Sequence, residues 1–473
     1  MTLQLKQADV DLVGSTKFDR YKKQSIEATY NMLISDNALV DYAGYEKRIN
    51  IGGNNSDARE IYRSVKFDHL IVIMDANVYV VDSNLSSALI GQLDTQSGPV
   101  SIAENNADQI AIVDGLNVYI LNTDAETFDT ISVDFRPVYI DFQDTYFIAA
   151  DGNSNNWRLS GQNDGTSWPF DAQHVGELET KPDILVATVR FDRQLFIMGT
   201  KTTEIWHDTG GQLFPYQRDN SISIDYGCLN SQTVASGFGR LVWLGANEKA
   251  GPTIMYSDGG PVKQLSTDGI NFILDKLTKP EDSTAFLFEE DGHVFYQITF
   301  FSDNVTYVYD FNTSKFFNIT DHCLNAHIAK RIAFFNNTHY FISSIDGGLY
   351  ELSTNFTTLK TTLDPDDDGH EIPRIRITKN FRLPDASKYV INQLSLTTET
   401  GQSANNMRID LSLSKDGGHS FGTVLTKEVK PVANRTNRFR YWRLGASNDT
   451  VFQFRFWGKS RFVGIHATME YFQ

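Results

Sequence analysis

One stretch in the first third of the chain sets the fold: Gln109-Ile110-Ala111-Ile112-Val113, then Asp114-Gly115-Leu116-Asn117, then Val118-Tyr119-Ile120-Leu121. Two apolar runs flank a short polar segment. Asp-Gly is a frequent hairpin dipeptide, because tight hairpin turns need positive φ angles, which glycine adopts without steric cost. The stretch therefore predicts a β-hairpin, and residues 69–81 repeat the pattern around Asp75-Ala76-Asn77.

The hairpin pattern recurs along most of the chain. A single antiparallel unit of this kind cannot bury both of its faces, whereas radial stacking buries them and leaves only short edges. We therefore predict a β-propeller of about seven blades over residues 61–362, at the roughly 30- to 50-residue spacing of four-stranded blades. One large sandwich built from the same hairpins is the alternative. Later units start near Val138, Leu185, Arg240, Ala285 and Ile328.

The two ends of the chain differ from this middle region. Residues 1–60 are mostly polar and contain the turn signal Gly52-Gly53-Asn54-Asn55, so we expect an irregular N-terminal arm. Asp364-Pro365-Asp366-Asp367-Asp368-Gly369 resembles a linker. Beyond it, runs such as Phe452-Gln453-Phe454-Arg455-Phe456 alternate with period two, which indicates half-buried strands. We expect a β-sandwich over residues 363–473.

Charge and composition exclude several classes of protein. The 473 residues carry a formal net charge of −17, which disfavours general binding to phosphate backbones. Residues 427–461 oppose this trend with nine basic and two acidic residues, and they form either an interface for an acidic partner or a solvated strand face. The start of the chain is polar, with no signal-peptide core, and no run is long enough for a membrane span. Cys228 and Cys323 are expected to be reduced core residues.

Motifs for chemistry are weak. Asp364, Asp366 and Asp368 match the opening of a calcium loop, but Ile375 stands where its closing glutamate belongs. Ser414-Lys415-Asp416-Gly417-Gly418-His419-Ser420-Phe421 matches an Asp-box, which we interpret as a fold element. The sequence has no nucleophile elbow, P-loop or zinc-binding histidine spacing. We therefore predict no catalytic residues, no cofactor and no metal.

A family resemblance rests on motifs that occur in one order over residues 155–473. This order resembles the packaged-DNA stabilisation, or tail hub, family of short-tailed bacteriophages. The motifs begin with Ser160-Gly161-Gln162-Asn163-Asp164-Gly165-Thr166-Ser167-Trp168 and Glu179-Thr180-Lys181-Pro182-Asp183, and they end with Tyr441-Trp442-Arg443-Leu444-Gly445 and Val451-Phe452-Gln453-Phe454-Arg455.

The resemblance implies a structural role in the virion. Such proteins are hub subunits, commonly six in a ring, below the portal and its adaptor ring. They carry the tail needle or plug, neighbour the tailspikes or tail fibres, and hold the packaged genome until ejection. Double-stranded DNA would pass nearby without specific binding. We expect assembly in the host cytoplasm and no contact with a membrane.

Four residues of the basic stretch are the interface candidates, because arginine and tryptophan often anchor protein interfaces. They are Arg438, Arg440, Trp442 and Arg443. For Trp442, packing in the core is the competing interpretation.

Two other functions remain open at this stage. The Asp-box also occurs in sialidases, which makes a glycan-binding or sialidase-like propeller of a phage tail the principal alternative. A cellular propeller scaffold ranks last, because the repeated signatures of such proteins are missing.

Overall fold

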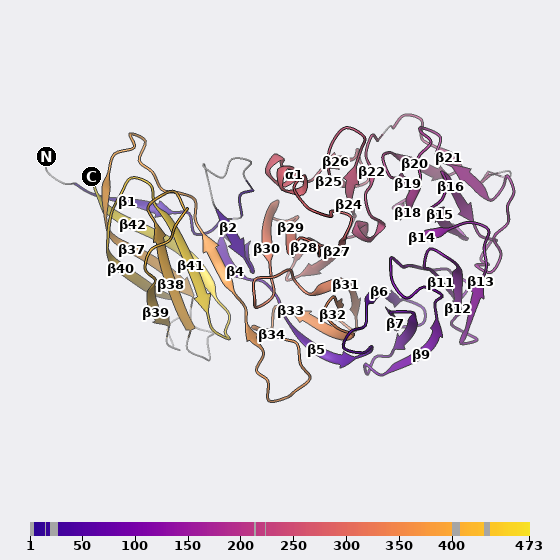
Figure 1. The fold of residues 1–473 in the computed structure, drawn as a ribbon, viewed down its shortest axis with the longest axis horizontal. Coiled ribbons are helices and arrows are strands. Elements are labelled where there is room, and N and C mark those ends of the chain that lie inside the picture. Colours follow the sequence, from indigo (N-terminus) through magenta and orange to yellow (C-terminus); the bar gives the residue numbers. More distant parts are fainter. Residues whose placement is uncertain are drawn as a thin grey trace.

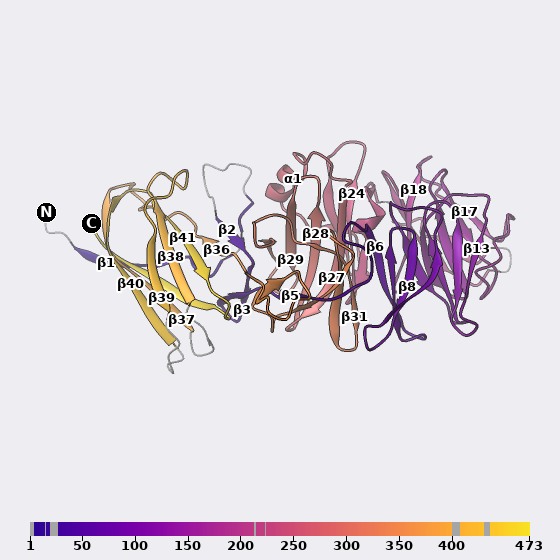
Figure 2. The ribbon, with the colours of Figure 1, turned by 60° about the horizontal axis from the view of Figure 1, so that its bottom comes forward.

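The chain folds into two β-domains that lie next to each other along its long axis (Figures 1 and 2). The computed structural model describes residues 4–14, 16–18, 27–211, 214–222, 224–399, 407–429 and 436–473. Within these ranges, 42 strands accompany one short α-helix, α1 (Asp268–Leu274), and one 3-10 turn (Ser231–Thr233). The predicted all-β class is confirmed.

The larger domain is a propeller of seven blades, as predicted. The first strands of neighbouring blades contact each other around the axis, as β10 and β14 do. The strands of blades 1 to 4 are β6 (Ala58–Ser64), β7 (His69–Met74), β8 (Asn77–Val81) and β9 (Ser87–Gln92); β10 (Ser101–Glu104), β11 (Gln109–Val113), β12 (Val118–Asn122) and β13 (Thr127–Ile131); β14 (Pro137–Gln143), β15 (Tyr146–Asp151), β16 (Asn156–Leu159) and β17 (Val175–Glu177); and β18 (Leu185–Phe191), β19 (Gln194–Gly199), β20 (Thr203–Asp208) and β21 (Tyr216–Arg218).

The remaining three blades complete the ring. In blade 5 the inner strand is divided into two short pieces, β22 and β23, which both pair with β24. The strands of blades 5 to 7 are β22 (Gly227–Cys228), β23 (Ala235–Gly237), β24 (Arg240–Ala246), β25 (Thr253–Ser257) and β26 (Lys263–Gln264); β27 (Ser283–Glu290), β28 (His293–Phe300), β29 (Val305–Asp310) and β30 (Lys315–Ile319); and β31 (Ala329–Phe335), β32 (Thr338–Ser343), β33 (Gly348–Ser353) and β5 (Gly44–Asn50).

The hairpins form where the sequence predicts them. Strands β11 and β12 pair in antiparallel register across Asp114-Gly115, and Gly115 has a φ of 84°. In the turn between β7 and β8, Asp75 has a φ of 53°. The apolar residues of these strands pack between blades, as Ile73 of blade 1 and Ile112 of blade 2 do in a shared buried cluster. Stacking of blades thus buries the faces that a lone hairpin would expose.

The prediction of an irregular arm over residues 1–60 is wrong, because strands within this range belong to both domains. Strand β5, from within residues 1–60, is the fourth strand of blade 7 and joins the start of the chain to β33, with Tyr45 opposite Leu352. Its polar composition, with Glu46, Lys47 and Arg48 in succession, conceals it in the sequence. On this strand Lys47 pairs with Asp346 at 2.7 Å, and Arg48 pairs with Glu351 at 2.7 Å. Three further strands of the expected arm belong to the second domain: β1 (Leu5–Val10), β3 (Met32–Ser35) and β4 (Ala38–Asp41).

The second domain is the predicted β-sandwich. One sheet has the order β3-β4-β42-β37-β40, with β1 added to β42, and the other contains β36-β41-β38-β39. Leu394, Phe454 and Met469 are among the residues buried between the sheets. The remaining strands are β36 (Arg374–Ile377), β37 (Tyr389–Glu399), β38 (Met407–Ser414), β39 (Leu425–Val429), β40 (Thr436–Ser447), β41 (Val451–Trp457) and β42 (Val463–Phe472).

A three-residue strand joins the two domains. Strand β2 (Ala28–Tyr30) pairs in parallel with β30 of blade 6 and in antiparallel with β36 of the sandwich, so one nine-stranded sheet crosses the boundary. Beside it, the side chain of Asn31 donates to Thr320 Oγ1 at 2.8 Å and to the carbonyl of Pro373 at 3.0 Å. Such a shared sheet disfavours free motion between the domains.

The acidic segment Asp364–Gly369 lies within a hairpin at this boundary. It connects β34 (Thr358–Lys360), which pairs in parallel with β5, to β35 (His370–Glu371). The sheet of blade 7 therefore extends to Glu371, and the next sandwich strand begins three residues later, at Arg374.

Candidate interaction surfaces

The four interface candidates all lie on β40, an edge strand of the sandwich. Alternate residues of a strand point to opposite faces. Phe439 and Tyr441 pack against the buried core, whereas Arg438, Arg440 and Trp442 are exposed on the other face. Trp442 is 54% exposed, so its packing in the core is excluded. We call Arg438, Arg440 and Trp442 the β40 row.

Arg443 does not continue this row. Gln393 of β37 lies opposite Trp442, but Ile391, two residues earlier, lies opposite Gly445, three residues later on β40. One residue of β40 is therefore extra at this point. Arg443 falls in this bulge with a φ of 57° and is exposed. A bulge redirects a side chain relative to its strand. Arg443 is therefore an exposed neighbour of the β40 row.

The face around the β40 row is polar. On the adjacent strand β37, Gln393, Ser395 and Thr397 lie opposite Trp442, Arg440 and Arg438. Gln393 and Ser395 are nonetheless buried, as expected where long neighbouring side chains cover short ones. The other edge of β40 has no pairing strand among the described residues, so its backbone groups are available to a partner.

The nine basic residues of 427–461 do not form one face. Lys427 on β39 and Arg455 on β41 belong to the other sheet, whereas the β40 row and Arg443 lie on β40, at the end of the sandwich away from the propeller (Figures 1 and 2). Lys430 and Arg435 lie outside the described residues. The face that carries the β40 row thus combines arginine with an exposed aromatic ring.

Charge is divided between the two domains. Residues 44–353 contain 41 acidic and 20 basic residues, whereas residues 374–473 contain 7 acidic and 16 basic residues. The net charge of −17 therefore resides in the propeller, and the sandwich is positive. Domains of opposite net charge, such as this propeller and this sandwich, attract each other at low ionic strength.

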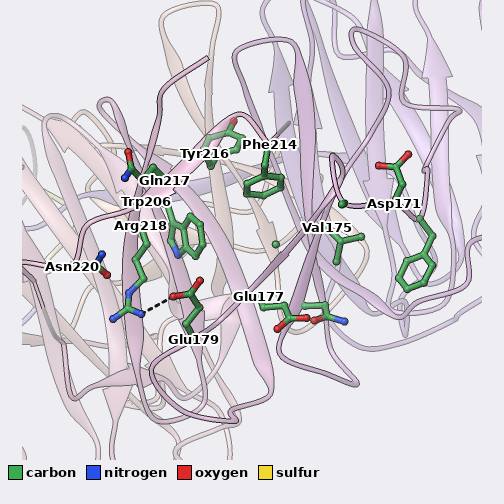
Figure 3. A pocket seen from close by; sticks show the side chains of 14 residues that line it. Asp171, Val175, Glu177, Glu179, Trp206, Phe214, Tyr216, Gln217, Arg218 and Asn220 are labelled. Carbon is green, nitrogen blue, oxygen red and sulfur yellow. Dashed lines mark hydrogen bonds and ion pairs between the residues drawn. The ribbon is translucent and has the colours of Figure 1, made fainter. Parts of the chain in front are cut away.

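The propeller has an open pocket of about 760 Å³ between the outermost strands of blades 3 and 4, shown in Figure 3. Trp206 and Phe214 form one side, with Val175 and Asp171 across from them. Below lie Glu177 and Glu179, and the Arg218 guanidinium is 3.1 Å from Glu179. The full lining is Asn156, Phe170, Asp171, Ala172, Val175, Gly176, Glu177, Glu179, Trp206, Phe214, Tyr216, Gln217, Arg218 and Asn220. We call it the blade 3–4 pocket.

A glycine and a buried tryptophan support this pocket from below. Trp157 is fully buried beside Trp206, with ring centres 5.3 Å apart. A Cβ atom on Gly176 would lie 2.2 Å from the Trp157 ring, so only glycine fits at that position of β17. The pocket lining holds a single arginine, Arg218, which pairs with Glu179 and lies 3.5 Å from Glu204. It therefore lacks the arginine cluster with which a sialidase holds its substrate carboxylate.

A second pocket, of about 500 Å³, lies where the β3–β4 hairpin meets blade 6. Here His293 Nε2 is 3.1 Å from Ser35 Oγ, and His293 Nδ1 is 2.9 Å from the buried Asp310 carboxylate. This is the hydrogen-bond order of a serine hydrolase triad. The same carboxylate also accepts hydrogen bonds from Asn312 N and Thr313 Oγ1, and so caps the β29–β30 turn.

The Asp-box forms a tight turn, as interpreted from the sequence. Asp416 accepts hydrogen bonds from Ser414 Oγ at 2.6 Å and from the backbone and side chain of Ser420. These bonds hold the pKa of Asp416 well below its usual range.

Possible metal ligands gather at one place within the described ranges. Asp321, His322 and Cys323 are consecutive, and their ligand atoms lie within 4.8 Å of one another. The Asp321 carboxylate already accepts hydrogen bonds from the backbone of Cys323 and Asn325, as a turn cap. Cys228 is buried, but Cys323 is exposed, which corrects its expected place in the core.

Comparison with known proteins agrees with this architecture, a seven-bladed propeller joined to a β-sandwich. A family model described as "Bacteriophage P22 Gp10, beta-propeller" matches residues 28–355, and one described as "Bacteriophage P22 Gp10, beta-sandwich" matches residues 374–471. The protein is thus a bacteriophage structural protein. It belongs to the bacteriophage P22 Gp10 family, the DNA-stabilisation tail hub proteins of podoviruses.

The other comparisons find distant likenesses or nothing. Among solved structures, catalytically inactive virginiamycin B lyase from Staphylococcus aureus with quinupristin is 10% identical (TM-score 0.46; 65% of this chain, 99% of that chain). The N-terminal domain of Nup159 is 9% identical (0.43; 69% and 98%), and the RRP9 WD40 repeats are 8% identical (0.43; 66% and 99%). No curated protein matches. Among the described residues, no helix is both long and apolar enough to cross a membrane.

Proposed function

We propose that this protein is the hub subunit that closes the DNA exit channel of a short-tailed phage. In this role several copies form a ring, six by the family resemblance, below the portal and its adaptor ring. The ring holds the tail needle or plug and neighbours the tailspikes or tail fibres. It stabilises the packaged genome and opens for ejection, after assembly in the host cytoplasm.

The observation that carries this proposal is the sheet shared by the two domains. Strand β2 links blade 6 to the sandwich through backbone hydrogen bonds, which makes a long, rigid building block. A channel-closing ring needs stiff subunits with interfaces at separated places, and stacked hairpins supply both. The β40 row and the blade 3–4 pocket are the candidate interfaces.

The charge of the propeller suits a channel through which DNA moves. Contacts with phosphate dominate the affinity of proteins for DNA, and they need lysine or arginine. The propeller, with 41 acidic and 20 basic residues, offers few such contacts. We infer that packaged double-stranded DNA passes the hub without specific binding.

The test is a phage that lacks this subunit. Particles made without it should package DNA and then lose it, and supplying the protein during assembly should restore DNA retention and infectivity. Nuclease sensitivity of the genome in purified heads measures retention. Heads that keep their DNA without the subunit would refute the proposal.

An acyl-transfer enzyme is the one competing function with a geometric basis, namely the Ser35–His293–Asp310 arrangement. We favour a structural role for it, because its hydrogen bonds join the β3–β4 hairpin to blade 6 and Asp310 also caps a turn. A fluorophosphonate probe separates the two, since it reacts with activated serine only. No adduct at Ser35 is expected, whereas an adduct that disappears in His293→Ala would establish a hydrolase.

A further inference from the structure

We propose that the β40 row of one copy of this chain docks into the blade 3–4 pocket of the next copy. This inference rests on the proposed function, which requires self-association, and it names the two surfaces. The contact is head-to-tail: each copy donates its sandwich end and accepts the sandwich end of a neighbour. A contact of this type gives a ring when its rotation closes.

The two surfaces lie at opposite ends of the molecule. The sandwich is attached to the outermost strands of blades 6 and 7, through β2 on β30 and β34 on β5. In a ring of seven blades, blades 3 and 4 lie across the axis from that attachment. Figures 1 and 2 accordingly show β17 and β21 near one end of the long axis and β40 near the other. One copy therefore cannot fill its own pocket.

The charges of the two surfaces are complementary. The pocket presents Asp171, Glu177 and Glu179. Asp171 is 2.7 Å from His174, and Glu179 is paired with Arg218, whereas Glu177 is exposed and has no ion-pair partner among the described residues. The β40 row supplies Arg438 and Arg440, for which no ion pair exists within the described ranges. Complementary charges steer two surfaces together and fix their register.

The apolar parts of the two surfaces also match. Trp442 is half exposed at the end of the β40 row, and such a ring is a frequent anchor of interfaces when it enters a pocket. The walls of the blade 3–4 pocket include Trp206, Phe214 and Val175. Its volume of about 760 Å³ is within the range of pockets that enclose a drug-sized ligand, so an indole ring fits.

A charge-swap series in assembled particles tests the contact. The variant Arg438→Glu with Arg440→Glu should reduce incorporation of the subunit into tails at least about tenfold, since a tenfold change in affinity corresponds to only about 1.4 kcal/mol. Adding Glu177→Arg and Glu179→Arg to the same chain re-creates attraction between neighbours and should restore incorporation to within about threefold. Quantitative gel analysis of purified particles measures both.

Matched controls separate this contact from general effects of charge. Asp124→Arg with Glu126→Arg changes two exposed acids on blade 2 and should not rescue the chain that carries R438E and R440E. Conversely, Lys388→Glu with Lys427→Glu removes two exposed bases elsewhere on the sandwich and should leave incorporation unchanged. Unfolding midpoints of all purified variants should match that of the parent, because every changed side chain is exposed.

A cysteine pair tests the geometry directly. In a Cys323→Ser background, Arg440→Cys and Glu177→Cys should form covalent ladders of subunits when assembled tails are oxidised, and either cysteine alone should not. Failure of both the rescue and the ladder would overturn the contact even if particles still need the subunit to hold DNA. If particles without the subunit hold DNA normally, the proposed function itself fails.

Discussion

Arg374 on β36 and Asp41 on β4 form an ion pair between the two sheets of the sandwich, with Nε 2.8 Å from Oδ1 and both side chains buried. The arginine Nη1 also donates to the carbonyl of Gly458, and Asp41 Oδ2 accepts from the backbone of Phe462. Burial raises the pKa of Asp41, and Arg374 opposes that shift. Each charge of this pair therefore compensates the other where both are removed from solvent.

Removing one partner of this pair should destabilise the sandwich. Arg374→Ala leaves Asp41 buried without its counter-charge, and we expect a loss of about 3–5 kcal/mol in the free energy of unfolding. Urea titration at pH 7 measures it. Arg382→Ala is the matched control, because Arg382 pairs with Asp449 at the surface with its own side chain 55% exposed, and its loss should cost under about 1 kcal/mol. Equal effects of the two substitutions would contradict this account of the buried ion pair.

Closure of the propeller ring should depend on Gly44. A Cβ atom at this position would lie 2.5 Å from the carbonyl oxygens of both Phe356 and Thr358, so Gly44→Ala must displace β5 or the segment that contains Phe356 and Thr358. We expect a loss of about 1–3 kcal/mol, the usual range for a substitution that overpacks a tight site. Gly53→Ala is the control, since its nearest contact is 3.7 Å away. Thermal unfolding compares them, and a Gly44→Ala protein as stable as the control would show that this close approach does not matter.

Stability should fall in acid because of His327. Burial lowers the pKa of His327 to about 4, against about 6.5 in an unfolded chain. Between these values the unfolded chain binds a proton that the folded chain does not, so stability decreases as the pH falls, by up to about 3 kcal/mol. Asp141 acts in the opposite direction, because burial raises its pKa to about 6.

The substitution His327→Gln isolates the histidine contribution. The unfolding free energy of the variant should lose less than that of the parent between pH 7 and pH 4, while the Asp141 contribution stays the same in both. Parallel urea titrations across this range provide the comparison. Identical pH profiles of the parent and the variant would rule out a buried, neutral His327.

Trp442 should contribute little to folding. Its ring is half exposed, so Trp442→Ala should change the unfolding free energy by no more than about 0.5 kcal/mol. By contrast, Trp157→Ala removes a fully buried ring and should cost about 3–5 kcal/mol. Differential scanning calorimetry of the two variants distinguishes a surface anchor from a core residue, and a large loss for Trp442→Ala would place it in the second class.

Local sequence patterns predicted the elements whose partners are close in sequence. The Asp114-Gly115 turn and the alternation of Phe452 to Phe456 lead directly to a hairpin and a sandwich strand. The exposure of Trp442 could also have been predicted, because Trp442 alternates with Phe439 and Tyr441 in the same way as Arg438 and Arg440 do, and so points to the same face as these arginines.

Long-range features were not predictable in this way. Strand β5 pairs with β33, about 300 residues later, and its own composition is polar. Arg374 and Arg376 look like the solvent side of an alternating strand, yet both are buried, because Asp41 and Glu27 from the start of the chain cover them. The blade 3–4 pocket likewise forms only when β17 and β21 become neighbours, so no local motif marks it.

Imaging of purified tails with this subunit labelled tests the central claim most directly. The account predicts a ring of labels where the tail joins the portal and its adaptor, with the seven-bladed propeller recognisable in each copy. Particles that contain no label, or that carry it only at the tips of the spikes or fibres, would contradict the hub assignment.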